Sequence, residues 1–125
     1  METNILVIDD DNAILDVITF ILEDKGYMVT AISDSNLVES YLLSHVPSMV
    51  LVDFWMAGLN GKKIVAMIQD NPQTTNVPVI MISANHDVEK IAKEIHANDF
   101  LAKPFDIAEL LSKIETYLPT NTNTP

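Results

Sequence analysis

The sequence predicts an α/β domain in which a parallel sheet is covered by helices on both faces. Short apolar runs rich in β-branched residues alternate with segments of helical periodicity, and this alternation occurs five times. The runs are almost continuously apolar, as expected for strands that are buried on both faces. The length of 125 residues suits one domain with one sheet.

The five expected strands are short, and polar residues or turn formers bound them. They are expected over residues 4–8, 27–32, 49–52, 77–82 and 99–102. The third run ends at Asp53, and the fourth is entered through Pro78. Chain order then requires right-handed crossovers between successive strands, each of them made by a helix.

The first expected helix has apolar residues at 14, 15, 17, 18, 21 and 22, which share one helical face. Gly26 is a natural end for it. A weaker helix is expected to start near Ser35. A loop that contains Gly58 and Gly61 precedes a third helix, and a fourth helix is expected around Val88 to Ile95.

The last helix is expected to open on a capping box formed by Asp106 and Glu109. Pro119 should end it. Its apolar residues are expected to face the core, namely Ile107, Leu110, Leu111, Ile114 and Leu118. We therefore expect one domain over residues 1–118, followed by a flexible polar tail over residues 119–125.

Composition excludes several classes of function. There are 7 basic and 18 acidic residues, giving a formal charge of −11, and every basic residue is a lysine. This balance argues against binding to nucleic acid or to anionic membranes by this chain, and no apolar run is long enough to span a bilayer. The absence of cysteine excludes thiol chemistry and suits a reducing compartment, so we expect a cytoplasmic location.

Polar side chains that can carry chemistry follow the ends of the expected strands. Asp9 and Asp10 follow the first strand, Asp53 the third, Ser83 the fourth and Lys103 the fifth. In parallel α/β sheets, ligands bind outside the carboxyl ends of the strands. We therefore expect these five residues to meet at one edge of the sheet.

Three carboxylates in one pocket repel each other, and a bound divalent cation relieves that repulsion. Oxygen ligands favour a hard ion such as Mg²⁺. A carboxylate can also act as a nucleophile and become an aspartyl phosphate, with cations and donors around the transferred group. Each motif has a purely structural interpretation too. The role of Asp9, Asp10 and Asp11 could be limited to capping a helix. Asp53 could simply form a turn, and a cis Pro104 could simply orient Lys103.

Taken together, these residues resemble the receiver domain of bacterial two-component signalling, over about residues 4 to 118. Five segments carry the resemblance: residues 5–11, residues 50–56, Gly61, residues 78–84 and residues 99–105. The resemblance implies a flavodoxin-like three-layer (βα)5 sandwich with strand order 2-1-3-4-5.

The resemblance also implies a Mg²⁺ site and a phosphoacceptor. Asp10 and Asp53 would ligate the ion directly, Asp9 would act largely through water, and the backbone carbonyl of Trp55 would complete the protein ligands. Asp53 would accept a phosphoryl group from a histidine kinase or a histidine phosphotransfer protein.

Three further roles follow from the same resemblance. Ser83 and Lys103 would contact the phosphoryl group, and Phe100 would occupy the aromatic switch position, whose ring swings inward when Ser83 moves toward the phosphate. Phe100 could equally be a plain core aromatic, and the two roles are compatible. His96 stands where the family commonly has glycine, so a positive φ there would strain the backbone.

Partners are expected at two separate surfaces. The kinase would dock near the first helix and Pro104–Phe105. An unknown downstream effector, or a second copy in a phosphorylation-linked dimer, would use the fourth helix, fifth strand and last helix, including Ile91, Phe100 and Leu101.

Two other functions compete with a phosphorylated receiver. An aspartate-nucleophile phosphohydrolase of the haloacid dehalogenase type uses similar groups, but it needs an Asp-x-Asp pattern after its first strand, and Asp9-Asp10 has no spacer. A phosphate-independent receiver would act only as a protein-interaction module. Such receivers usually lack one of the five site residues, whereas this sequence has all of them. We therefore expect a signalling phosphoacceptor that is not an enzyme acting on other substrates.

Overall fold

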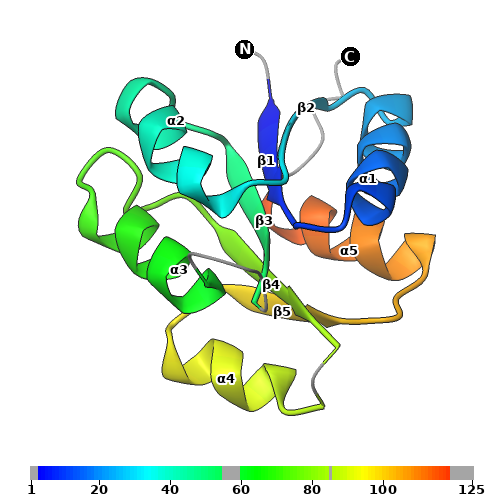
Figure 1. The fold of residues 1–125 in the computed structure, drawn as a ribbon. Coiled ribbons are helices and arrows are strands. Elements are labelled where there is room, and N and C mark those ends of the chain that lie inside the picture. Colours follow the sequence, from blue (N-terminus) through cyan, green and yellow to red (C-terminus); the bar gives the residue numbers. More distant parts are fainter. Residues whose placement is uncertain (1–2, 55–59, 85, 119–125) are drawn as a thin grey trace.

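The computed structural model describes residues 3–54, 60–84 and 86–118. Within these ranges, five parallel strands form one sheet in the order β2-β1-β3-β4-β5. Helices cover both faces of the sheet (Figure 1), so the three-layer α/β architecture and the strand order that the resemblance implied are both confirmed. Among these residues, no helix has the length and apolar character to cross a membrane.

The strands lie close to the positions expected from the sequence, although β2 and β4 begin slightly later than expected. They are β1 (Asn4–Ile8), β2 (Met28–Ile32), β3 (Met49–Asp53), β4 (Val79–Ser83) and β5 (Asp99–Ala102). The parallel register pairs Ile8 with Val52 and Ser83 with Ala102. The carboxyl ends of these strands therefore reach the same edge of the sheet.

The helices follow the strands in strict alternation. They are α1 (Asn12–Asp24), α2 (Val38–Ser44), α3 (Gly61–Asp70), α4 (Val88–Glu94) and α5 (Ile107–Tyr117), and a short 3₁₀ helix (Ser35–Leu37) leads into α2. In Figure 1, α1 and α5 lie on one face of the sheet, and α2, α3 and α4 lie on the other.

The core divides into layers because successive side chains of a strand point to opposite faces. In β1, Ile5 and Val7 pack with the inward residues of α1 and α5. Leu6 and Ile8 pack instead against α2 and α3. All four side chains are fully buried. This explains why the strand sequences are apolar throughout, without a polar alternation.

Several local signals in the sequence form as expected. Asp106 and Glu109 make a complete capping box at the start of α5. Gly26 follows the end of α1 and has φ +92°, a conformation that glycine adopts without a Cβ penalty. His96 has φ 63°, so the backbone at that position does adopt the positive φ considered from the sequence.

Three details of the expected fold are wrong. Gly61 is the first residue of α3 and not part of the preceding loop. Ile107 does not face the core, since it is 56% exposed. Leu101 is only 2% exposed and packs in the core, so it cannot belong to an outward-facing effector surface. Gly58, Pro119 and the expected tail lie outside the described residues.

Candidate functional site

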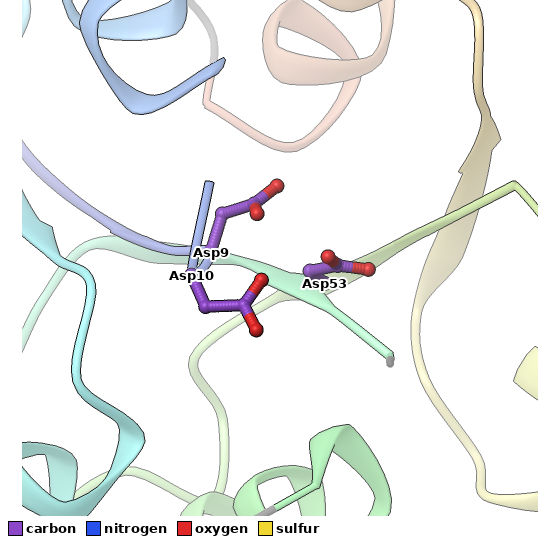
Figure 2. A group of neighbouring side chains, drawn as sticks. All are labelled: Asp9, Asp10 and Asp53. Atoms are coloured by element: carbon purple, nitrogen blue, oxygen red, sulfur yellow. The ribbon is translucent and has the colours of Figure 1, made fainter. Parts of the chain in front are cut away.

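Three carboxylates gather where β1 and β3 end. Asp9 directly follows β1, Asp10 comes next, and Asp53 is the last residue of β3. One carboxylate oxygen from each lies within 4.8 Å of the other two. Figure 2 shows the Asp10 carboxylate pointing toward Asp53 at the end of the neighbouring strand, with the Asp9 carboxylate above them. Asp9 and Asp53 are buried, whereas Asp10 is exposed. The expected convergence of the acidic residues is therefore found.

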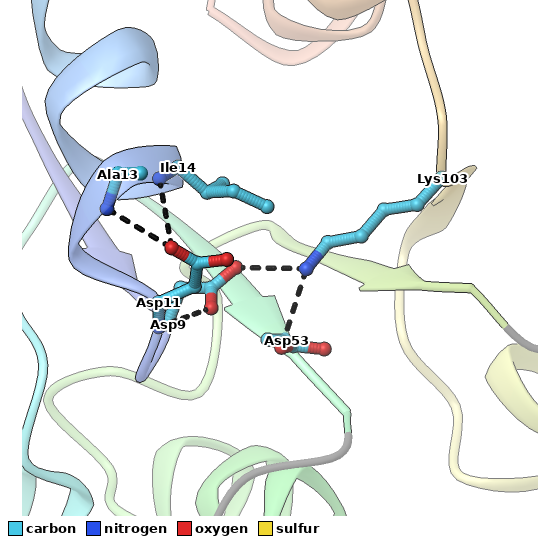
Figure 3. A network of polar contacts seen from close by, with 6 residues as sticks. All are labelled: Asp9, Asp11, Ala13, Ile14, Asp53 and Lys103. Carbon is cyan, nitrogen blue, oxygen red and sulfur yellow. Dashed lines mark hydrogen bonds and ion pairs between the residues drawn. The ribbon is translucent and has the colours of Figure 1, made fainter.

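Lys103 supplies a positive charge to this cluster from the segment after β5. Its Nζ lies 3.0 Å from Asp9 Oδ2 and 3.4 Å from Asp53 Oδ2 (Figure 3). Burial by itself would lower the pKa of Lys103, but the two carboxylates outweigh it and hold the pKa above its ordinary value. The ammonium thus remains charged at neutral pH, and two of the three acids share it.

The backbone after β5 is fixed against β4. The Lys103 amide donates a hydrogen bond to the Ser83 carbonyl at 2.8 Å, and the Lys103–Pro104 peptide bond is cis. Ser83 is the last residue of β4 and is fully buried. It follows Ile82, which pairs with Asp53 in the register of the sheet. Ser83 therefore lies at the same edge as Asp53 and Lys103, as the sequence predicts.

The consecutive acids at the end of β1 have divided roles. Asp11 is the N-cap of α1, and its Oδ1 accepts hydrogen bonds from the amides of Ala13 and Ile14 (Figure 3). Asp9 Oδ1 accepts from the Asp11 amide at 2.9 Å, which leaves Asp9 Oδ2 facing Lys103. The purely structural interpretation of these acids thus holds for Asp11, while Asp9 and Asp10 belong to the carboxylate cluster.

Gly61 contributes to the site in a way that the sequence analysis missed. A Cβ added at Gly61 would lie 2.6 Å from the Cα of Phe54, the residue directly after Asp53. The Gly61 amide donates to the Phe54 carbonyl at 3.0 Å. The start of α3 can therefore lie against the backbone beside Asp53 only because position 61 has no side chain. A glycine soon after a site aspartate was the available signal.

Phe100 lies on β5 and is partly buried. It packs at the border of a small cluster beneath α4 that contains Phe54, Met81, Val88 and Ala92. Two residues that the sequence analysis did not single out contact it, because the Asp99 carboxylate accepts from the Phe100 amide and Lys113 lies over its ring. Trp55, the expected carbonyl ligand, lies outside the described residues.

An apolar groove adjoins the carboxylate cluster. It has a volume of about 460 Å³ and runs between α1 and the segment after β5. Lys103 contributes to its wall, so the groove reaches the site itself. Its lining residues are Ala13, Ile14, Val17, Ile18, Ala84, Lys103, Pro104 and Phe105. The groove coincides with the surface that the sequence analysis assigned to a docking kinase.

The donor set suits a hard divalent cation. Each of the three aspartates offers a carboxylate oxygen, and among the described residues no nitrogen or sulfur ligand belongs to the group. Three acids are balanced by one ammonium, so a cation would relieve the remaining repulsion. Because Asp10 is exposed, one side of the cluster is open to solvent, and an ion held there could keep water ligands.

Comparison with known proteins identifies the family. The model of the response regulator receiver domain matches residues 5–115, and the chain therefore belongs to the receiver domain family of two-component signalling. The DNA-binding response regulator MtrA of Mycolicibacterium paratuberculosis is 28% identical over 127 residues, which cover 100% of this chain and 55% of MtrA. The phosphate regulon transcriptional regulatory protein PhoB of Klebsiella pneumoniae is 27% identical, over 94% of this chain and 52% of PhoB. The chain spans about half the length of these relatives.

A solved structure agrees with this assignment. The receiver domain of the sensor histidine kinase PA1611 from Pseudomonas aeruginosa has a TM-score of 0.85 and 25% identity, covering 96% of this chain and 100% of that domain. That structure has a magnesium ion coordinated in its active-site cleft.

Proposed function

We propose that this receiver domain accepts a phosphoryl group on Asp53 from a phosphohistidine of a kinase or phosphotransfer protein. The contact between Lys103 and both buried acids carries this proposal, because it joins Asp53 to a cation and a second carboxylate at one point. A structural ion pair would need only one acid. The arrangement instead suits a site where negative charge arrives and must be neutralised.

In the proposed reaction, an Asp53 carboxylate oxygen forms a bond to phosphorus, and the bond between phosphorus and the donor imidazole nitrogen breaks. The product is an aspartyl phosphate, and the imidazole retains the electron pair. Asp9, Asp10 and Asp53 would hold Mg²⁺, with the Trp55 carbonyl as a further ligand. When bound, the ion would neutralise charge on the phosphoryl oxygens.

The remaining site residues would act on the transferred group. The Lys103 ammonium would exchange part of its contact with Asp53 for a phosphoryl oxygen, and the Ser83 hydroxyl would donate to another. The Phe100 ring would move inward when Asp53 is loaded, which would carry the change toward α4 and α5. These roles rest on the edge that the residues share and on their match to the family motifs.

The experiment uses phosphoramidate with Mg²⁺ and reads the intact mass of the protein. We expect a phosphoryl adduct on the wild type that is lost without Mg²⁺ and absent from Asp53→Asn. Asp70→Asn, at the exposed end of α3, is the matched control and should retain the adduct. No adduct on the wild type would instead favour a phosphate-independent interaction module. Steady turnover of phosphomonoesters would indicate a hydrolase.

The apolar groove beside Lys103 supports a docking position for the phosphohistidine donor. A donor helix seated between α1 and Pro104 would bring its histidine to Asp53. Val17→Asp, on the exposed part of this groove, should abolish transfer from a phosphorylated kinase that labels the wild type. Labelling by phosphoramidate should continue. Leu43→Asp, on α2 and 78% exposed, is the control. Loss of both kinds of labelling in Val17→Asp would argue against a docking role.

We also propose cytoplasmic action, to which the cysteine-free composition is suited. A downstream effector or a second copy would bind the face formed by α4, β5 and α5, now without Leu101. Amide shift changes on phosphorylation that avoid this face would contradict that assignment.

A further inference from the structure

A second polar cluster lies on β5 and α5, apart from the carboxylate site. Lys113 Nζ on α5 is 2.8 Å from Asp99 Oδ1. The same ammonium lies 4.8 Å from the centroid of the Phe100 ring. Asp99 is held in turn, because its Oδ1 accepts the Phe100 amide at 2.8 Å and its Oδ2 lies 3.1 Å from the Tyr117 hydroxyl. Lys113 is thus fixed over the ring by a carboxylate that is itself fixed.

Phe100 links this polar cluster to the neighbourhood of Asp53. Its ring borders the small apolar cluster beneath α4, which contains Phe54, Met81, Val88 and Ala92. Phe54 directly follows Asp53, and Met81 pairs with Phe100 in the sheet register. A change of packing at Asp53 can therefore reach the ring through a single side-chain layer.

The ring has two unlike neighbours. The apolar cluster lies on its inner side, and the ammonium of Lys113 lies over its face. The attraction between a cation and an aromatic face acts within roughly 6 Å of the centroid. The ammonium cannot follow the ring freely, because Asp99 anchors it. Movement of the ring further into the cluster must therefore weaken this attraction.

We propose that Lys113 is a positioning residue for the Phe100 ring. It holds the ring in an outer position, the partly buried one at the border of the apolar cluster, and so couples α5 to the loading of Asp53. The coupling rests on the proposed phosphoryl acceptance, whereas the hold on the ring does not. Removing the ammonium shifts the equilibrium of the ring toward the inner position by about two- to fivefold, the range that a partly exposed cation–π contact corresponds to.

The test uses the whole chain with 4-fluorophenylalanine in place of its four phenylalanines. The Phe100 resonance is assigned with Phe100→Leu, and binding of beryllofluoride with Mg²⁺ is followed by ¹⁹F NMR. Lys113→Met keeps a long side chain but removes the charge, and Lys113→Arg keeps the charge. Lys93→Met, an exposed lysine on α4, is the matched control. Thermal unfolding of each variant establishes that it is folded.

In the free protein, Lys113→Met should move the Phe100 resonance, and neither Lys113→Arg nor Lys93→Met should do so. The same variant should bind beryllofluoride about two- to fivefold more tightly, with Lys113→Arg restoring the wild-type affinity. An unmoved resonance in folded Lys113→Met overturns the hold on the ring. A moved resonance with unchanged affinity overturns the coupling alone. If the wild type binds no beryllofluoride, the proposed function fails together with the coupling. The Phe100 resonance in Lys113→Met still tests whether Lys113 holds the ring.

Discussion

Three aspartates show how neighbours determine what a side chain does. Asp9 and Asp11 are two residues apart, yet one faces Lys103 and the other caps α1. Asp99, which the sequence analysis read only as the start of a strand, anchors Lys113. In each case the residue type is common, and the role comes from the partner that the fold brings to it.

The pH dependence of stability should carry a contribution from Asp99. Burial alone would raise the pKa of this carboxyl, but hydrogen bonds from Lys113 and the Phe100 amide outweigh burial and lower the pKa below its ordinary value of 3.8. A depressed folded pKa stabilises the protein above the unfolded value, and that stabilisation is lost as the pH falls below about 3.8. Urea unfolding from pH 6 down to pH 3 measures it.

We expect the wild type to be more stable than Asp99→Asn near neutral pH. The difference in stability should shrink as the pH falls below about 3.8. Asp70→Asn controls for the loss of one negative charge on the surface. A difference between wild type and Asp99→Asn that is constant down to pH 3 would show that the ion pair is not what stabilises the native state.

Replacing His96 by glycine should make the protein more stable. A non-glycine residue at φ 63° carries a Cβ clash that glycine lacks. His96→Gly should raise the free energy of unfolding by up to about 1 kcal/mol, since the gain exceeds the extra entropy of glycine in the unfolded chain. His96→Ala keeps the Cβ and should give no gain. Chemical denaturation compares the three proteins, and equal stability of the Gly and Ala variants would exclude strain.

At the scale of elements, the contact between α3 and the end of β3 is the most constrained one beside the site. The start of α3 approaches the backbone of Phe54 so closely that a methyl group has no room. The helix and the strand are therefore coupled through one glycine. A change in that contact must move either the helix or the residue next to Asp53.

Gly61→Ala should accordingly destabilise the protein by about 1–3 kcal/mol, the usual cost of forcing atoms into a packed contact. It should also slow phosphoryl uptake from phosphoramidate, because the displaced backbone adjoins Asp53. Lys62→Ala, on the exposed side of the same turn, should change neither property appreciably. Denaturation midpoints and adduct formation over time are the measurements. A fully stable and active Gly61→Ala would mean that α3 shifts without cost.

At the scale of the whole molecule, the formal charge is −11, and in the carboxylate cluster three acids lie together while Lys103 contacts two of them. Mg²⁺ should raise the melting temperature more than NaCl of equal ionic strength, by the equivalent of about 2–3 kcal/mol at ~100 times its dissociation constant. Asp10→Asn should lose most of this gain. In a chelator, the same variant should be more stable than wild type, because repulsion is relieved.

Differential scanning fluorimetry with Mg²⁺, NaCl and a chelator separates these effects. Equal responses to Mg²⁺ and NaCl would indicate general screening rather than a bound ion.

The sequence by itself determined the five βα units, the positions of the strands and the polar residues at their carboxyl ends. These features depend on local apolar periodicity and on caps such as Asp106, which neighbouring residues specify. The family motifs then allowed the strand order to be predicted. Only the tertiary structure decided that Asp9 shares Lys103 with Asp53 and that Leu101 is buried. It also decided that Gly61 lets the start of α3 pack against the backbone of Phe54 and that Lys113 lies over Phe100. Those relations join residues far apart in the chain, and they follow from packing and register, which periodicity does not specify.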